Sequence, residues 1–218
     1  MRERPTSAFV ADALRGARLR QLPAEDAQVA AGRADDLDAL AALAVRGDAE
    51  AVRGLYDALV RPIYRYVAVR VRRREDAEDL TQVVFERIVA SLPTYRGRGR
   101  PFEAWAFRIA RNAVIDHLRR ERPHQVLDGL TEPAQRDRGP EALSLRSEEL
   151  RELRAALSDL TVDQQEAIAL RFAAGLSAEE AAQVMGRRAG TVRGLTFRAI
   201  HALRRRLAGQ DPPTGGNR

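Results

Sequence analysis

The sequence predicts an all-α protein built of two small helical domains joined by a flexible linker. Apolar residues recur at three- and four-residue spacing through most of 37–122 and again from 148 onward. No segment alternates apolar and polar residues as a half-buried strand would, and no βαβ rhythm appears. Prolines and glycines interrupt residues 123–147, where no periodicity remains. We therefore predict a first domain over 37–122, a linker over 123–147 and a second domain over 148–209.

The two ends of the chain lack the pattern of a packed domain. Residues 1–36 are rich in alanine, arginine and acidic residues and show only weak periodicity, which predicts a largely disordered extension. Residues 210–218 have the composition of a disordered tail. The linker over 123–147 can span at most roughly 80–90 Å, enough for the two domains to hold separate sites on one DNA duplex.

Helix boundaries in the first domain are marked by caps and breakers. Gly47 interrupts the pattern, and Asp48 after it is a suitable N-cap for the next helix. Further helices are predicted over 74–92 and 102–122, because each stretch ends immediately before a proline. The segment 93–101 between them is predicted to be a loop from its proline and glycine content.

Composition restricts the classes of partner and chemistry. The 218 residues carry a formal net charge of +6, and all 37 basic residues are arginine. This balance favours anionic partners, nucleic acid first and an acidic membrane surface second. The absence of cysteine excludes disulfides, thiolate metal sites and cysteine nucleophiles. No run of 18 apolar residues and no apolar signal core occur, so we expect a cytoplasmic protein without membrane insertion.

Residues 176–206 predict a helix-turn-helix. Ser177 is a suitable N-cap, and Glu180 three residues later completes a capping box. A short helix is therefore expected to run to Met185, where Gly186 breaks it, and a second helix to begin at Thr191. Two short helices joined by a tight glycine-containing turn are typical of DNA-binding proteins.

The second of these helices has an apolar stripe and an opposite basic face. The stripe comprises Val192, Leu195, Ala199, Leu203 and Leu207. No acidic residue accompanies the arginines between 181 and 210, and an exposed aromatic can touch thymine methyls in the major groove. The predicted DNA-contacting residues are Arg187, Arg188, Thr191, Arg193, Gly194, Phe197, Arg198 and His201.

A second candidate nucleic-acid face lies in the loop before residue 102 and on the helix after it. An asparagine can pair with an adenine edge, arginines suit phosphates, and interleaved aromatics suit the stacking of unpaired bases. The predicted contact residues are Tyr95, Arg96, Arg98, Arg108, Arg111, Asn112 and Arg119. Trp105 and Phe107 are better explained as core, since both have apolar neighbours.

The helix over 75–92 has an acidic face, which DNA would repel. This face comprises Glu78, Asp79, Gln82, Phe85 and Glu86. Two interpretations stay open at this point. The face with an exposed Phe85 suits a protein surface with basic residues, or it is a solvated charged face with a partly buried Phe85.

Three motifs in order resemble an RNA polymerase sigma factor of the sigma-70 family. They are "EDAEDLTQVVFERI" (75–88), "FEAWAFRIARNAVIDHLRR" (102–120) and the segment 157–205, which begins "LSDLTVDQQEAIALRF". The two-domain layout is similar to the extracytoplasmic function (ECF) group, which has regions 2 and 4 without region 3. The match covers roughly residues 37–208.

The resemblance implies a fold, partners and roles for these surfaces. It implies that the protein binds core RNA polymerase, through the β′ clamp helices and the β flap, and directs it to promoters. The acidic face would dock on the clamp helices, the 95–119 surface would open and read the −10 element, and the helix-turn-helix would read the −35 element. The implied partners are thus core polymerase and promoter DNA, duplex and single-stranded, with an anti-sigma protein as a further candidate.

Two other classes of protein would explain parts of the sequence. A LuxR-type helix-turn-helix regulator that never binds polymerase would explain residues 160–203 but leaves 75–120 without a role. An enzyme is disfavoured, because His117, His124 and His201 lie in different segments without metal-ligand spacing and no nucleotide-binding glycine motif is present. We therefore predict no catalytic residue, no cofactor and no metal site.

Overall fold

The computed structural model describes residues 36–71, 73–97, 101–125 and 155–207, and for 122–125 the backbone alone. Within these ranges the fold is all-helical, as predicted, and no strand occurs. A helix over 36–44 comes first, followed by α3 (Ala49–Arg70), α4 (Arg74–Ser91), the 3₁₀ turn η1 (Leu92–Thr94) and α5 (Phe102–Gln125). The C-terminal part contains a turn of helix over 155–158, α7 (Val162–Ile168), the π-helical segment η2 (Ala169–Ala173), α8 (Ala178–Met185) and α9 (Ala189–Leu207).

The first helical unit consists of residues 36–44, α3, α4 and α5, and its cap at α3 is confirmed. Asp48 accepts a hydrogen bond from the Ala51 amide at 3.0 Å. Gly47 before it has φ 91°, a left-handed conformation that favours glycine. The start of α5 is capped from a distance, because Asp38 accepts a bond from the Phe102 amide at 2.6 Å. Asp38 thus fixes α5 relative to the first helix.

The predicted end of α5 is wrong by three residues. The helix was expected to stop before Pro123, but its backbone continues through Gln125, so 123–125 are helical rather than linker. A proline removes its own amide hydrogen bond and its ring crowds the carbonyl four residues earlier, so Pro123 weakens the last turn of α5 without ending the helix there. The rest of the predicted linker lies outside the described residues.

The second unit is organised by two capping boxes. Thr161 and Gln164 form one at α7, and Ser177 and Glu180 form the predicted one at α8, with Ser177 N donating to Glu180 at 2.7 Å. Gly186 ends α8 with φ 64°, as the predicted break requires. The last helix begins at Ala189, two residues before the predicted start.

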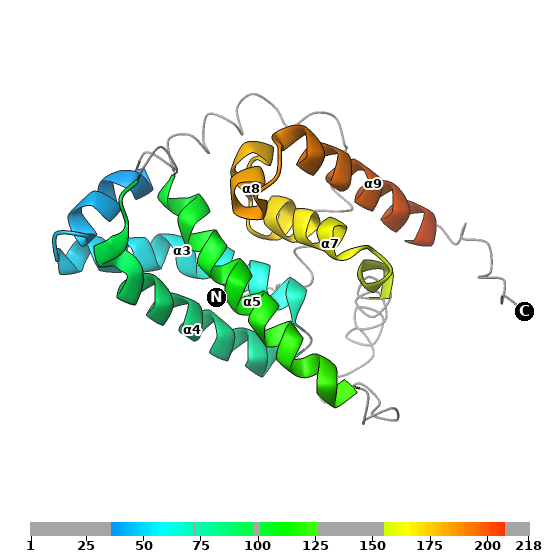
Figure 1. The fold of residues 1–218 in the computed structure, drawn as a ribbon, viewed down its shortest axis with the longest axis horizontal. Helices are drawn as coiled ribbons and strands as arrows, with labels where there is room; N and C mark the ends of the chain where they lie inside the picture. The colour runs from blue at the N-terminus through cyan, green and yellow to red at the C-terminus, as the bar shows by residue number, and fades with distance from the viewer. Residues whose placement is uncertain (1–35, 72, 98–100, 126–154, 208–218) are drawn as a thin grey trace, which may run out of the picture.

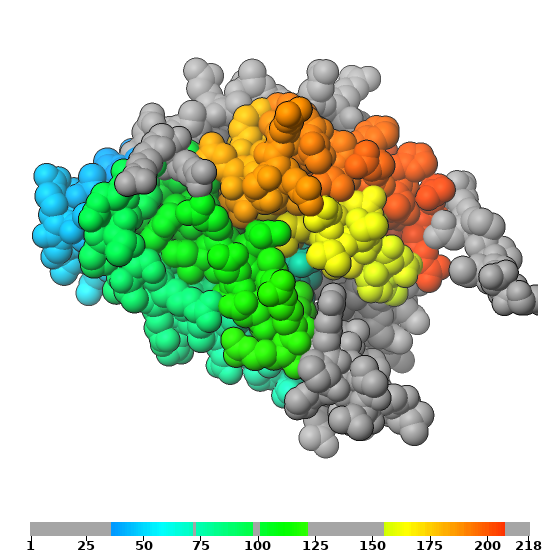
Figure 2. Space-filling view, viewed as in Figure 1, coloured from blue at the N-terminus to red at the C-terminus, as the bar shows by residue number. Residues whose placement is uncertain are grey.

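The two units pack against each other. Helix α5 contacts α8, and α3 contacts η2, so that one apolar core continues from Leu55, Ile63 and Phe107 of the first unit to Leu170 and Val184 of the second. A smaller core lies between α7 and α9. In Figure 2 the green surface of α5 meets the yellow and orange surface of the second unit without a break. The sequence predicted two helical domains joined by a linker and made no prediction of contact between them, and in this structure they share a core.

No helix among the described residues combines the length and the apolarity that crossing a bilayer demands.

Candidate nucleic-acid interface

The outer face of α9 is built as predicted. Val192, Leu195, Ala199 and Leu203 are buried against α7 and α8, together with Ile200. Phe197 on the opposite side is 71% exposed. Leu207, expected in the buried stripe, is 50% exposed because it is the last residue of the helix and has no neighbour to cover it among the described residues. A phenylalanine that gains nothing from folding is available for a partner.

Gly194 and the rings of Phe197 and His201 shape the exposed face of α9. A Cβ added at Gly194 would lie 3.4 Å from Nη1 of Arg198, so the Arg198 guanidinium extends over the backbone at Gly194. The His201 ring lies 6.5 Å from the Phe197 ring, and both are exposed. Thr191 is exposed at the start of the same helix. One face thus carries the Arg198 guanidinium over the partly exposed backbone at Gly194, and an exposed aromatic pair.

Several arginines of this surface have acidic partners that are remote in sequence. Arg187 pairs with Asp163 of α7 at 3.1 Å, Arg193 pairs with Glu179 of α8, and Arg206 pairs with Asp159 at 3.3 Å. The inference of uncompensated charge is therefore wrong for these three, because folding brings Asp159 before α7, Asp163 of α7 and Glu179 of α8 beside them. No described carboxylate pairs with Arg188, Arg198, Arg204 or Arg205. Exposed pairs contribute at most about 1 kcal/mol, so a phosphate can replace the carboxylate.

The candidate face on α5 is divided by the packing of the units. Asn112 and Arg119 are exposed, and Arg108 is half-buried. Arg111 is turned toward the second unit, with Nε 3.7 Å from Glu166 and its side chain 27% exposed. Arg96 is exposed beyond the end of α4, and Arg98 lies outside the described residues. The structure therefore gathers Arg108, Asn112 and Arg119 on one helix and separates Arg111 from their solvent-facing side.

Tyr95 is not a free stacking platform. Its ring packs on Phe102 and Trp105, with centroids 5.2 and 5.1 Å apart, and the hydroxyl faces Asp38. Partial burial, and then the negative charge of Asp38, raise the pKa of Tyr95 to about 12. Phe107 is buried as predicted, while Trp105 is half-buried. An unpaired base would have to stack on the rim of this aromatic cluster.

The packing of Phe85 on α4 decides between the two interpretations of the acidic face. This side chain is only 9% exposed and packs on the Tyr56 ring at 4.7 Å, so the expectation of an exposed phenylalanine is wrong. The other members point to solvent. They are Glu78, Asp79, Gln82 and Glu86, and we call them the acidic surface.

Sequence reasoning missed the apolar residues beside the acidic surface. Tyr56 is 48% exposed on α3, and Val89 is 50% exposed one turn beyond Phe85 and Glu86. Tyr56 could have been found only from the α3–α4 packing, because it precedes Phe85 by 29 residues. The surface therefore combines carboxylates with exposed apolar groups, a composition that suits a protein partner.

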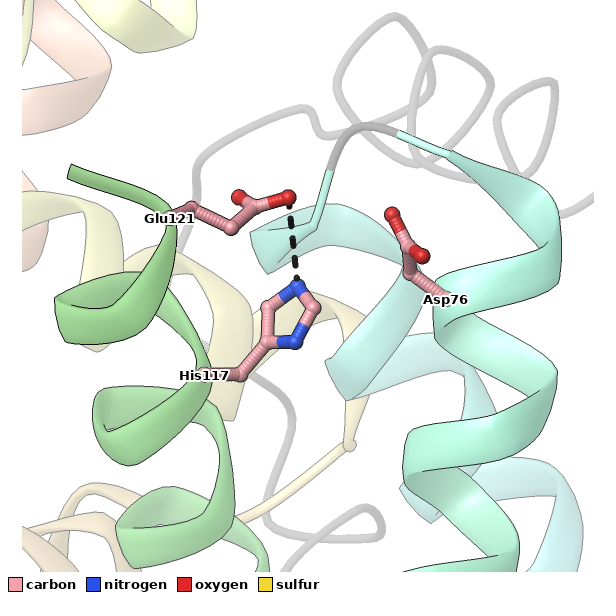
Figure 3. A group of neighbouring side chains, drawn as sticks. All are labelled: Asp76, His117 and Glu121. Carbon is pink, nitrogen blue, oxygen red and sulfur yellow. Dashed lines mark ion pairs between the residues drawn. The ribbon is translucent and has the colours of Figure 1, made fainter. Parts of the chain in front are cut away.

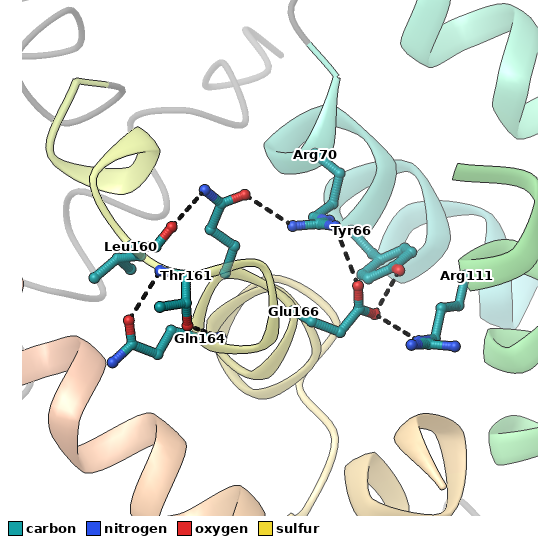
Figure 4. A network of polar contacts seen from close by, with 8 residues as sticks. Tyr66, Arg70, Arg111, Leu160, Thr161, Gln164 and Glu166 are labelled. Carbon is teal, nitrogen blue, oxygen red and sulfur yellow. Dashed lines mark hydrogen bonds and ion pairs between the residues drawn. The ribbon is translucent and has the colours of Figure 1, made fainter. Parts of the chain in front are cut away.

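A buried polar network joins the two units (Figure 4). Glu166 of α7 is 2% exposed, and it accepts a 2.7 Å hydrogen bond from the Tyr66 hydroxyl. Arg70 lies 3.3 Å from the same carboxylate and donates to Gln165 at 3.1 Å, and Arg111 completes the ring. Burial, and then the charge of Glu166, raise the pKa of Tyr66, which keeps this hydroxyl a neutral donor.

This network was not predicted from the sequence. Its only signal is an acid at position 166 directly before the apolar run Ala167–Leu170, where a charge needs a buried partner. Neither Arg70 nor Tyr66 can be identified from the sequence as that partner, because about 100 residues separate each of them from Glu166.

Comparison with known proteins agrees with both helical units. The family model for Sigma-70 region 2 matches residues 55–124, and the model for Sigma-70 region 4 matches residues 150–203. The chain is 39% identical over 163 residues to the ECF RNA polymerase sigma factor BldN of Streptomyces coelicolor, covering 74% of this chain and 62% of that protein. It is 35% identical over 175 residues to the ECF sigma factor SigD of Mycobacterium tuberculosis, covering 77% of this chain and 82% of that protein.

Two solved structures resemble the packed arrangement. CnrH in complex with the cytosolic domain of CnrY aligns with a TM-score of 0.63 at 26% identity, over 82% of this chain and 99% of that one. The sigma factor RpoE in complex with the anti-sigma factor NepR, from Bartonella quintana, aligns with a TM-score of 0.58 at 26% identity, over 73% and 98%. These shares exceed either helical unit alone, so both units take part in the alignment.

The two matched regions, in this order and on these helices, define a sigma factor of the sigma-70 family. The chain belongs to the ECF RNA polymerase sigma factors.

Proposed function

We propose that this protein binds core RNA polymerase in the cytoplasm and directs it to promoters, with no catalytic chemistry of its own. The observation that carries the DNA-binding part is the outer face of α9, where Phe197 is 71% exposed opposite a buried stripe. In a major groove, Arg198 and Arg193 would contact base edges or phosphates and Phe197 would touch thymine methyls. This is the −35 reader of our proposal, completed by Arg187, Arg188, Thr191, Gly194 and His201.

The −10 element is assigned to α5 and the loop before it. Asn112 is exposed and suits an adenine edge, and Arg108 and Arg119 suit phosphates on either side of it. Arg111 would join them once it leaves Glu166, since its Nε has no hydrogen bond in the packed arrangement. Trapping unpaired bases favours the open duplex, because binding stabilises the single-stranded state.

Core polymerase is assigned to the acidic surface on α4, with Tyr56 and Val89 as its apolar part. Carboxylates steer a basic partner surface, and the exposed tyrosine and valine supply area to bury. The packed arrangement supports a further candidate partner, an anti-sigma protein that binds both units together. The resemblance to the RpoE–NepR complex is what supports this assignment.

A binding experiment separates this function from that of a polymerase-independent regulator. Core RNA polymerase and the protein are mixed and analysed by size-exclusion chromatography, and duplex DNA binding is measured by fluorescence anisotropy on the same preparation. Comigration with core polymerase is the expected result. Duplex binding without comigration would contradict the proposal and favour the LuxR-type alternative.

A further inference from the structure

Three potential metal ligands meet where the start of α4 lies beside the last turns of α5. They are Asp76 from the first turn of α4 and His117 and Glu121 from α5, and each offers one donor atom within 4.8 Å of the other two (Figure 3). His117 and Glu121 are one turn apart, so α5 presents both on a single face. The acid from α4 approaches that face from across the helix–helix contact.

Two polar atoms of this cluster are buried without a hydrogen-bond partner. Oδ2 of Asp76 and Nε2 of His117 are cut off from solvent, and neither has a hydrogen-bond partner. The distance from His117 Nε2 to Glu121 Oε1 is 3.6 Å, too long for a hydrogen bond. Leaving two such atoms unpaired is unfavourable, and a single cation between them would satisfy both.

We propose that Asp76, His117 and Glu121 form a binding site for a divalent transition-metal ion, with zinc as the best-suited probe. One imidazole and two carboxylates are ligands that zinc accepts, and a water would complete four-fold coordination. Zinc–ligand distances near 2 Å place the donors of a tetrahedral site about 3.3 Å apart, so small side-chain rotations would close the cluster from its present spacing. The bound ion would cross-link α4 to α5.

This site was not predicted, because the three histidines alone show no metal-ligand spacing. The relevant pair is His117 and Glu121, which is a helical spacing, and the third ligand precedes them by about 40 residues. Only the packing of α4 on α5 brings Asp76 to them. The carboxylate of Asp116 is adjacent in sequence but lies toward Arg87 at 3.5 Å, outside the cluster.

The test is a zinc titration of the full chain without a histidine tag, after removal of metal by chelation. We expect isothermal titration calorimetry to give one zinc per chain with a Kd of about 10 μM or tighter, and zinc to raise Tm. His117→Ala, Glu121→Gln and Asp76→Asn should each weaken zinc binding at least about tenfold. Far-UV circular dichroism of each metal-free variant checks that the helices remain.

Two matched controls keep the interpretation specific. Asp116→Asn removes a carboxylate from the same helix as Glu121→Gln, and His201→Ala removes an exposed imidazole from α9. Both should bind zinc like the unchanged chain. Absence of saturable binding, or equal weakening by Asp116→Asn and Glu121→Gln, would overturn the proposed site. Neither result bears on promoter recognition, which the zinc titration does not measure.

Discussion

At the scale of single residues, the exposed face of α9 carries residues that do not stabilise the fold. Phe197 contributes nothing to the core, and Gly194 lowers helix propensity by about 1 kcal/mol relative to alanine. Neither residue type is favoured by folding at its position, which is consistent with the DNA contact that we propose for both. The sequence alone was enough to predict this face, because an isolated helix dictates which side chains share a side.

Phe197→Ala should weaken binding to promoter duplex by about 1 kcal/mol or more while Tm stays nearly unchanged. The physical reason is that the phenyl ring is exposed in the free protein and, in our proposal, would become buried on DNA. Fluorescence anisotropy with a −35 duplex and a thermal melt provide the two numbers. A large drop in Tm with unaltered DNA affinity would show that the ring has a structural role instead.

Gly194→Ala should have opposite effects on folding and binding. The unfolding free energy should rise by up to about 1 kcal/mol, since the new Cβ meets only the flexible end of Arg198 at 3.4 Å. Affinity for the −35 duplex should fall if the DNA backbone or a base edge approaches this residue closely. Chemical denaturation measures the unfolding free energy, and fluorescence anisotropy measures the DNA affinity. Unaltered DNA affinity would contradict the placement of Gly194 in the DNA interface.

At the scale of helices, the acidic surface of α4 is a property of two elements rather than one. Periodicity correctly placed Glu78, Asp79, Gln82 and Glu86 on a common side, but it could not determine whether Phe85 is covered, because Tyr56 comes from α3. Truncating Phe85 to alanine should therefore cost about 3–5 kcal/mol of stability, which makes it a poor probe of docking. The charged members are better probes.

Asp79→Arg should weaken binding to core polymerase while leaving Tm within about 1 °C of the unchanged chain, because Asp79 is exposed and forms no ion pair among the described residues. Competition binding against a labelled copy of the protein measures the affinity. Glu50→Arg makes the same charge change on α3 outside the acidic surface and should retain affinity. Equal affinity of Asp79→Arg and the unchanged chain would exclude this face from the docking site.

At the scale of the whole molecule, the contact between the two units is the feature that sequence reasoning did not anticipate. Each unit could be predicted from local pattern, caps and breakers, which act over a few residues. The network around Glu166 depends on groups about 55 and 100 residues away, and nothing local specifies such a pairing. It also engages Arg111, so the proposed contact of Arg111 with DNA would require this side chain to leave Glu166.

Glu166→Gln should loosen this packed arrangement. Removing the carboxylate charge leaves Arg70 and Arg111 without their buried counter-ion, and breaking a buried pair in this way costs about 3–5 kcal/mol. Small-angle X-ray scattering should show a larger radius of gyration, and Tm should fall. Glu179→Gln, which breaks an exposed pair with Arg193, should change neither. An unchanged radius and Tm for Glu166→Gln would mean that the network does not hold the units together.

Run-off transcription tests the central claim most directly. Core RNA polymerase is incubated with genomic fragments, with or without this protein, and the transcripts are mapped. We expect defined start sites that appear only with the protein, and we expect Arg198→Ala to reduce them in proportion to a loss of about 1–3 kcal/mol in −35 binding. Transcripts that are identical with and without the protein would contradict the assignment of promoter recognition to this chain.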